Sequence, residues 1–206
     1  MKFGVVVFPG SNCDRDTIYV LEEIANAQVI PLWHKETDLQ GVDFIILPGG
    51  FSYGDYLRSG AIAKFSAIMK EIIGFANAGG YVMGICNGFQ ILTEAKLLPG
   101  ALLHNISHKF ICKNIYLKTI TKNSLITNQC PEAPIKIPIA HAEGRYFANT
   151  KTLESLVAHD QILFRYCDEA GCINDMSNPN GSLMNIAGVC NKERNVFGMM
   201  PHPERA

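Results

Sequence analysis

The chain has 206 residues, of which 48% are hydrophobic and 18% are charged, and its formal net charge is −1. This length and composition predict a single globular domain over residues 1–206. Eighteen basic residues balance nineteen acidic ones, so the sequence lacks the basic excess that is typical of a nucleic-acid-binding protein.

The apolar runs and the cysteines further limit the class of protein that the sequence can encode. No apolar run approaches the ~20 residues that a membrane helix needs, and the start of the chain lacks the pattern of a signal peptide. The seven cysteines form no Cys-x-x-Cys pair, and the closely spaced Cys167 and Cys172 lack a second pair of ligands. We therefore expect a cytoplasmic protein with reduced thiols, no metal, no membrane partner and no nucleic-acid partner.

The first half of the chain alternates predicted strands with predicted helices. Strands are expected at residues 2–8, 28–32, 43–47 and 81–85. Helices are expected at residues 14–25, 61–78 and 87–95. In the second helix, Ser59 is the expected cap, Phe65 belongs to the apolar face, and Gly79-Gly80 ends the helix. This alternation predicts a mostly parallel sheet with helices on both faces.

The second half of the chain is richer in short β segments. Strands are expected at residues 110–120, 135–140 and 161–166, with turn-rich segments between them. Residues 184–190 and 196–200 flank a five-residue loop, a spacing that predicts a hairpin. We expect these strands to form a β-rich addition to the α/β fold.

Cys86 is the candidate nucleophile. It lies in Gly84-Ile85-Cys86-Asn87-Gly88, where a predicted strand meets a helix, and this is the nucleophile-elbow pattern with cysteine in the serine position. The helix N-terminus there favours a thiolate. The alternative is a buried, inert cysteine. Cys13 also joins a strand to a helix, but no glycine stands two residues after it, so it ranks below Cys86.

A thiol nucleophile needs a base, and the base needs a group that orients it. His202 lies in Pro201-His202-Pro203-Glu204, where the prolines favour extended backbone and residues two apart point to similar sides. Glu204 is therefore the expected partner of His202. The oxyanion of the reaction would be bound by the backbone N–H group of Asn87, and Gly49-Gly50 at the end of the neighbouring strand could supply a second donor, with a plain tight turn as the alternative.

Together these residues resemble the class I (triad) glutamine amidotransferases, and within that class the glutaminase subunits of phosphoribosylformylglycinamidine synthase. The resemblance covers essentially the whole chain. Its most distinctive segments are residues 8–14, 48–61, 84–90, 178–182 and 198–205. Two features depart from the family pattern: Ala142 stands where many members have glycine, and relatives usually continue past Pro-His-Pro-Glu-Arg into a closing helix.

The resemblance implies a flavodoxin-like α/β fold with Cys86 as nucleophile, His202 as base and Glu204 as its orienter. It also implies an oxyanion hole at Gly50 and Asn87. Gln90 and His141 would lie near the glutamine site.

The loop at residues 51–60 is the candidate gate for a partner, because it begins at the strand end that carries Gly50. Gly54 and Gly60 are possible hinges, and Asp55 and Arg58 offer polar contacts. The alternative is that Asp55 and Arg58 form an ordinary surface ion pair, worth at most ~1 kcal/mol.

The expected function is hydrolysis of L-glutamine to L-glutamate and ammonia. The ammonia would pass to a large synthetase subunit that converts formylglycinamide ribonucleotide to its amidine in purine biosynthesis, with a small accessory subunit in the complex. The chain has no Walker-type phosphate loop, so ATP and Mg²⁺ are expected on the synthetase and no cofactor in this chain. The alternatives are a glutaminase serving another amidotransferase, a related thiol hydrolase, or a catalytically dead regulatory subunit, which would have no need of the complete triad.

Overall fold

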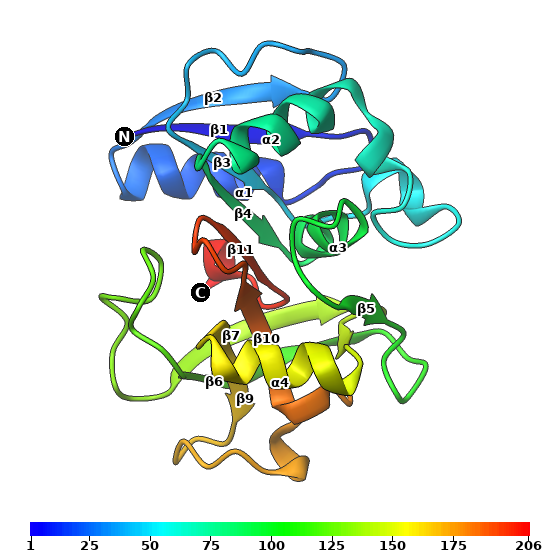
Figure 1. Ribbon diagram of the computed structural model, residues 1–206, viewed down its shortest axis with the longest axis vertical. Helices are drawn as coiled ribbons and strands as arrows, with labels where there is room; N and C mark the ends of the chain where they lie inside the picture. The colour runs from blue at the N-terminus through cyan, green and yellow to red at the C-terminus, as the bar shows by residue number, and fades with distance from the viewer. The chain divides into compact units, whose positions relative to one another are not determined.

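The computed structural model describes residues 1–206, and the chain divides into two compact units, Met1–Leu97 and Leu98–Ala206. Each unit has its own strands (Figure 1). Each also has its own buried apolar residues. The single domain expected from the length stays a prediction.

The first unit is built on a parallel sheet. Its strands are β1 (Lys2–Val7), β2 (Gln28–Trp33), β3 (Phe44–Leu47) and β4 (Tyr81–Ile85). They lie in the order β2-β1-β3-β4, and each adjacent pair is parallel. All four residues of β3 are buried, as expected of a strand in the middle of a covered parallel sheet. The strands predicted in this half are confirmed to within two residues.

Three α-helices belong to the first unit. They are α1 (Asp14–Tyr19), which continues as the π-helical turn η1 (Val20–Ile24), α2 (Ala67–Asn77) and α3 (Asn87–Glu94). Helix α1 packs on β1, α2 on β4, and α3 on β3 and β4. Gly79 follows α2 with φ +94°, a conformation that ends a helix and that glycine adopts without strain.

The predicted start of the second helix is wrong. Residues 63–65 form only a 3₁₀ turn, η3 (Ala63–Phe65), and Ser66 is extended with φ −65° and ψ 153°. Helix α2 therefore begins at Ala67. The Ile68 N–H donates to the His34 carbonyl at 3.2 Å, which fixes this start against the chain that follows β2. Phe65 is 80% exposed and does not belong to the apolar face.

The second unit contains an antiparallel sheet in the order β7-β6-β9-β10-β11. Its strands are β6 (Ile111–Thr119), β7 (Ile135–His141), β9 (Ile162–Cys167), β10 (Ile186–Cys190) and β11 (Val196–Met199). A separate two-stranded sheet pairs β5 (Ala101–Leu103) with β8 (Arg145–Phe147). The expected β-rich addition and its terminal hairpin are confirmed.

Helix α4 (Thr150–Ala158) was not among the predicted elements. It is capped by Asn149, whose side chain accepts a 2.9 Å hydrogen bond from the Thr152 N–H. The signal was present, since an asparagine cap precedes apolar residues at helical spacing. Short 3₁₀ turns complete the unit: η4 (Asp175–Ser177), η5 (Leu183–Asn185) and η6 (Pro203–Arg205). None of the helices combines the length and the apolar character that crossing a membrane requires.

Candidate active site

Cys86 occupies a strained elbow between β4 and α3. Its φ of 49° and ψ of −104° lie in a sparsely populated region, which costs roughly 1–3 kcal/mol. A Cβ on Gly88 would lie 1.9 Å from the Leu47 carbonyl oxygen, and one on Gly84 would lie 2.5 Å from the Gly88 carbonyl carbon. Both flanking positions therefore require glycine. The elbow predicted from the Gly-x-Cys-x-Gly spacing is present, with the side chain at the N-terminus of α3, where the partial positive charge favours an anion.

Gly50 and Asn87, the two residues predicted to bind an oxyanion, both belong to the first unit. Gly50 has φ +127°, and a Cβ there would lie 2.7 Å from the Asn12 nitrogen, so the backbone conformation is open only to glycine. Asn87 is the first residue of α3, where backbone N–H groups have no partner within the helix.

The Asn87 side chain is fully buried and uses all four of its hydrogen-bonding positions. Its Oδ1 accepts from the Ser52 N–H at 3.1 Å and, through a short bond, from the Ser52 hydroxyl. Its Nδ2 donates to Asp55 Oδ1 at 3.1 Å and to Gln90 Oε1 at 2.9 Å. The carboxamide thus ties the loop at residues 51–60 to the first turn of α3. Gln90, predicted to lie near the substrate, is buried and takes part in this network.

The polar residues predicted to gate the loop have different partners. Arg58 pairs with Glu94 at the end of α3, with Nη2 and Oε1 2.5 Å apart, and Asp55 accepts from Asn87. The structure records no Asp55–Arg58 surface pair, the alternative considered for these two residues.

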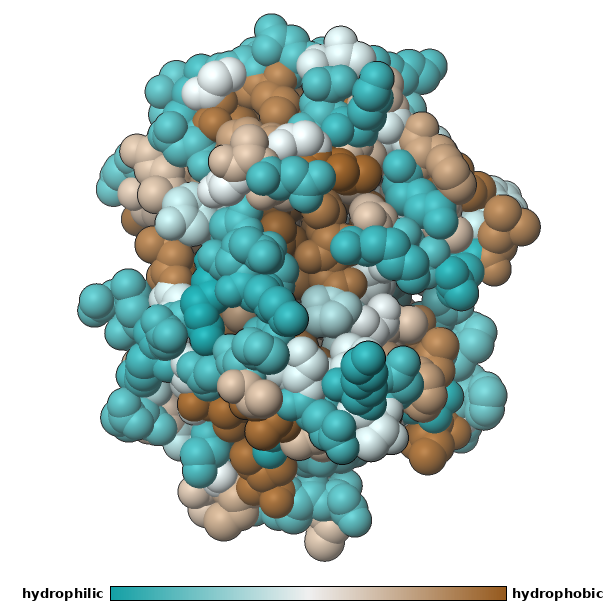
Figure 2. Space-filling model, viewed as in Figure 1, coloured by the Kyte–Doolittle hydropathy of each residue, from teal (hydrophilic) through white to brown (hydrophobic).

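The loop itself is strained and exposed at its tip. It begins with the 3₁₀ turn η2 (Ser52–Asp55), and Tyr53, Asp55 and Leu57 all have positive φ without being glycine. Tyr56 is 73% exposed and Leu57 is 93% exposed. In Figure 2, apolar spheres protrude at the edge where Figure 1 draws this loop in cyan. Exposed apolar groups on a strained loop are available to a partner.

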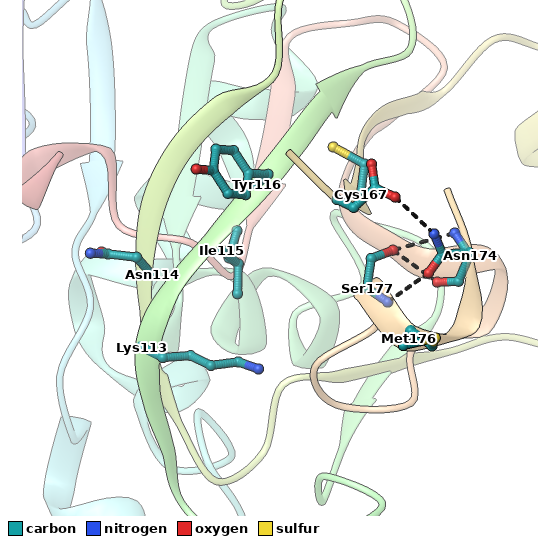
Figure 3. Close-up of a pocket in the computed structure, with 9 residues that line it drawn as sticks. Lys113, Asn114, Ile115, Tyr116, Cys167, Asn174, Met176 and Ser177 are labelled. Atoms are coloured by element: carbon teal, nitrogen blue, oxygen red, sulfur yellow. Dashed lines mark hydrogen bonds between the residues drawn. The ribbon is translucent and has the colours of Figure 1, made fainter. Parts of the chain in front are cut away.

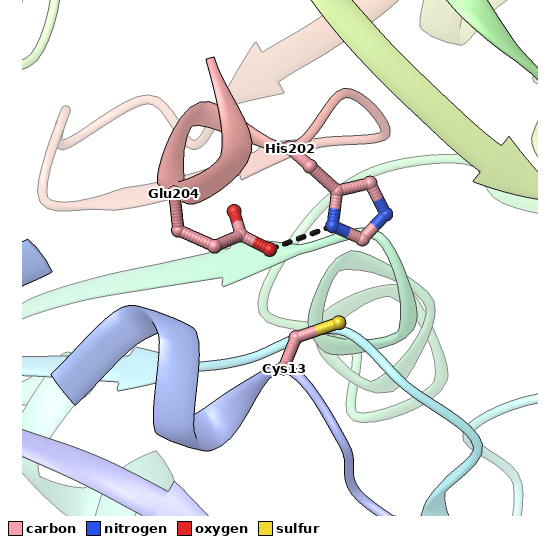
Figure 4. Close-up of side chains that lie close together, drawn as sticks. All are labelled: Cys13, His202 and Glu204. Atoms are coloured by element: carbon pink, nitrogen blue, oxygen red, sulfur yellow. Dashed lines mark hydrogen bonds and ion pairs between the residues drawn. The ribbon is translucent and has the colours of Figure 1, made fainter. Parts of the chain in front are cut away.

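His202 and Glu204 form a buried pair in the second unit. The His202 ring is 2% exposed, and its Nδ1 lies 2.7 Å from Glu204 Oε1 (Figure 4). A carboxylate oxygen accepts hydrogen bonds, so Nδ1 carries a hydrogen and Nε2 is the ring nitrogen that can exchange a proton. The pair forms as predicted, but through a different backbone, because Glu204 lies in the turn η6 rather than in an extended chain. The His202 N–H donates to the Pro138 carbonyl at 3.0 Å, which anchors this segment to β7.

Cys13, the rival nucleophile, is also drawn in Figure 4. It is 2% exposed at the N-cap position of α1, with φ −98° and ψ 0°. Its thiol donates to Asn12 Oδ1 at 3.3 Å. Cys13 therefore lacks the strained elbow that surrounds Cys86. The ranking of the two cysteines made from the sequence stays a prediction.

His141 is buried in the second unit, and its tautomer can be assigned. Asn105 Nδ2 donates to the carbonyl oxygens of Lys109 and His141, so its Oδ1 is the acceptor that faces His141 Nδ1 at 3.1 Å. Nδ1 therefore carries the hydrogen, and the buried Nε2, which has no partner, is left as an acceptor. Burial first, and then the charge of His202, lower the pKa of His141 to about 4. The ring is neutral near pH 7.

The segment around His141 is held by buried amides and hydroxyls. Asn180 Nδ2 donates to the Gly144 carbonyl at 2.8 Å, and the Ser182 hydroxyl donates to Asn180 Oδ1 at 2.8 Å. Gly144 lies against the His141 ring, where a Cβ would come within 2.3 Å of Cε1. Ala142, the departure from the family pattern, has no positive φ and is exposed, so the backbone accommodates alanine there.

The sequence indicated residues 178–182 as a motif but did not predict that they hold the segment around His141. It also did not single out Asn105 or Ser52. Both are polar residues that become fully or nearly fully buried. Their partners, His141 and Asn87, are 36 and 35 residues away. Only buried polarity at these positions could have indicated them, and burial is not visible in the sequence.

A cavity of about 400 Å³ lies elsewhere in the second unit, between β6 and the loop that follows β9 (Figure 3). None of the predicted site residues lines it. Several of its polar groups bond to one another, since Asn174 donates to Asp168 and forms reciprocal hydrogen bonds with Ser177. This arrangement closes a loop rather than presenting groups to a ligand.

Comparison with known proteins agrees with the geometry. The CobB/CobQ-like glutamine amidotransferase domain matches residues 1–206. Phosphoribosylformylglycinamidine synthase subunit PurQ of Moorella thermoacetica is 55% identical over 206 residues, covering 100% of this chain and 87% of that protein. The corresponding subunit of Synechocystis is 56% identical, covering 100% and 92%.

Solved structures give the same result. The structure of PurLQS from Thermotoga maritima contains a chain that is 45% identical with a TM-score of 0.85, covering 100% of this chain and 88% of that one. A glutamine amidotransferase from the same organism shares only the fold, at 14% identity and a TM-score of 0.63, covering 100% of this chain and 76% of that one. The α/β fold and the resemblance expected from the motifs are both confirmed, and the chain belongs to the CobB/CobQ-like glutamine amidotransferase family.

Proposed function

We propose that this chain is the glutaminase subunit of a phosphoribosylformylglycinamidine synthase, working in the cytoplasm on L-glutamine. The observation that carries the proposal is the strained elbow at Cys86, whose two flanking glycines are required by backbone contacts under 3 Å. The names of the relatives, at 51–56% identity over at least 98% of the chain, support the choice of synthase.

The first half of the reaction forms a thioester. The Cys86 thiolate attacks the side-chain carboxamide carbon of glutamine, and the carbonyl oxygen becomes an oxyanion that accepts hydrogen bonds from the Gly50 and Asn87 N–H groups. Collapse of this intermediate breaks the C–N bond. The protonated His202 gives its proton to the leaving nitrogen, so that ammonia departs and a glutamyl thioester remains on Cys86.

The second half of the reaction releases glutamate. His202, neutral again, accepts a proton from a water molecule that attacks the thioester carbonyl, and Cys86 leaves as the thiolate. The buried Glu204 keeps the hydrogen on His202 Nδ1, so that Nε2 is the nitrogen that exchanges protons in both halves. His141 offers its Nε2 only as an acceptor, which suits an N–H donor of the substrate.

The ammonia would be consumed by a synthetase subunit that holds ATP and Mg²⁺, with a small accessory subunit in the complex. The name PurLQS of the similar Thermotoga structure supports a multisubunit assembly. In this proposal the exposed Tyr56 and Leu57 make the loop at residues 51–60 accessible to the synthetase, which raises a low rate of hydrolysis in the free chain by setting the Gly50 N–H. A glutaminase of another pathway is the second candidate, but the 51–60 loop and the relatives favour this synthase.

The deciding experiment uses the assembled synthase with C86A. We expect glutamine-dependent formation of the amidine to be lost, while formation from added ammonia persists, because the synthetase uses ammonia from any source. C13A is the matched control, since Cys13 is an equally buried thiol of the same unit. Normal glutamine-dependent turnover by C86A, or equal loss in C13A, would contradict the assignment.

A further inference from the structure

The backbone conformation of the loop at residues 51–60 is energetically unfavourable. Tyr53, Asp55 and Leu57 have φ values of 55°, 52° and 71°, a region that costs a non-glycine residue on the order of 1 kcal/mol or more. A segment in such a conformation persists only where its surroundings determine it. The partners that hold this loop therefore decide the geometry of the strand end from which it departs.

Two kinds of contact hold the loop to α3. At the surface, Arg58 pairs with Glu94, but the Arg58 side chain is 55% exposed, and exposed ion pairs contribute little. In the interior, the fully buried Asn87 carboxamide accepts two hydrogen bonds from Ser52 and donates one to Asp55. Breaking a buried, fully satisfied set of hydrogen bonds costs more than losing a surface pair.

The position of Asn87 in the chain gives this contact a consequence for the reaction. Asn87 follows the nucleophile directly, and its backbone N–H is one proposed oxyanion donor. Its side chain accepts a hydrogen bond from the Ser52 N–H. Ser52 lies two residues after Gly50, and the Gly50 N–H is the other proposed oxyanion donor. One residue therefore supplies the second donor and fixes the segment that supplies the first.

We propose that Asn87 is a positioning residue, whose carboxamide couples the conformation of the 51–60 loop to the oxyanion-binding backbone at Gly50. This inference rests on the proposed function and deepens its regulation. A change imposed on the loop reaches the Gly50 segment through Asp55, the Asn87 carboxamide and Ser52. The carboxamide is needed because it must accept from Ser52 and donate to Asp55 at the same time, which neither a carboxylate nor an apolar side chain can do.

The pattern of donors and acceptors allows a swap experiment. N87D places a carboxylate where Nδ2 now donates, about 3.1 Å from Asp55 Oδ1, so two like charges meet in a part-buried site. The double variant N87D/D55N restores one donor and one acceptor with their positions exchanged, because the amide introduced at position 55 can then donate to the new carboxylate. Gln90 can meet either form by turning its own amide.

The measurement is glutamine-dependent amidine formation by the assembled synthase, with melting temperatures recorded for every variant. At pH 8 we expect N87D to lower kcat at least tenfold, and N87D/D55N to recover most of that loss. The ratio of N87D activity to wild-type activity should rise as the pH falls toward 6, where the carboxyl pair can share a proton. N77D, at an exposed position of α2, is the matched control and should follow the wild type.

Three outcomes would overturn the proposal: wild-type kcat in N87D, no recovery in the folded double variant, or a loss in R58A as large as that in N87D. The last would mean that the surface ion pair holds the loop. Ammonia-dependent synthesis should persist in every variant. Failure of this inference is distinguishable from failure of the proposed function, because C86A would still abolish glutamine use while N87D did not.

Discussion

The two units place their reactive groups by different means. In residues 1–97 the backbone positions the reactive group, because the strained φ of Cys86 and the contact between Gly88 and Leu47 determine where the thiol lies. In residues 98–206 side-chain hydrogen bonds position the histidine rings: Glu204 orients His202 and Asn105 orients His141. A site set by the backbone leaves glycines in the sequence. A site set by distant side chains leaves little that a sequence pattern can reveal.

The largest effect should come from the backbone contact. In G88A the new methyl group would meet the Leu47 carbonyl oxygen at 1.9 Å. Strand β3 is paired on both sides and α3 packs on β3 and β4, so neither can move away without losing pairing or packing. We expect a loss of about 3 kcal/mol or more in the free energy of unfolding, measured by urea denaturation, because backbone overlap in a packed core has no cheap relaxation.

A matched control lies on α2. A Cβ on Gly74 would meet nothing within 4 Å, and Gly74 has no positive φ. G74A should therefore stabilise the protein by up to about 1 kcal/mol, because alanine favours a helix over glycine. Equal stability of G88A and the wild type would remove the steric reason for the glycine in the elbow.

A smaller effect, on catalysis more than on folding, is expected in the other unit. E204Q keeps an oxygen near His202 but removes the negative charge that stabilises the protonated ring, and its amide can favour the wrong tautomer. We expect kcat for glutamine-dependent synthesis to fall by roughly 10²-fold or more, with a modest change in KM. E193Q, at an exposed position of the same unit, is the control. A wild-type kcat in E204Q would show that the pair is structural only.

The same contrast explains how much the sequence could predict. The strands of the first unit follow from buried apolar runs, and the elbow follows from its two glycines. The start of α2 did not follow, because apolar periodicity continues across Ser66, where the backbone is extended and the Ile68 N–H donates to the distant His34 carbonyl. Propensity and pattern are local, and a distant partner can override them.

In the candidate site the limit has the same origin. The His202–Glu204 pair was predictable because its members are two residues apart. The networks of Asn87 with Ser52 and of His141 with Asn105 were not, because burial of both partners is settled only when strands that are distant in sequence come together.

The smallest expected effect concerns His141, in the unit where side-chain hydrogen bonds position the reactive groups. Burial holds the pKa of its ring at about 4 in the folded protein, against 6.5 in the unfolded chain. The unfolded state therefore binds more protons between pH 6.5 and 4. The stability that His141 contributes as a neutral ring is complete above pH 6.5 and is lost as the pH falls toward 4.

Between pH 7 and 4.5 this linkage should remove about 2–3 kcal/mol from the free energy of unfolding. H141Q lacks the titrating ring, so between pH 7 and 4.5 its free energy of unfolding should fall by about 2–3 kcal/mol less than that of the wild type. We expect the variant to be less stable than the wild type at pH 7. Urea denaturation at the two pH values measures both slopes, and H159Q, which removes an exposed ring of the same unit, controls for the loss of a histidine. If H141Q and the wild type lost the same stability, His141 would not be held neutral by its surroundings, and its Nε2 would not be restricted to accepting a hydrogen bond.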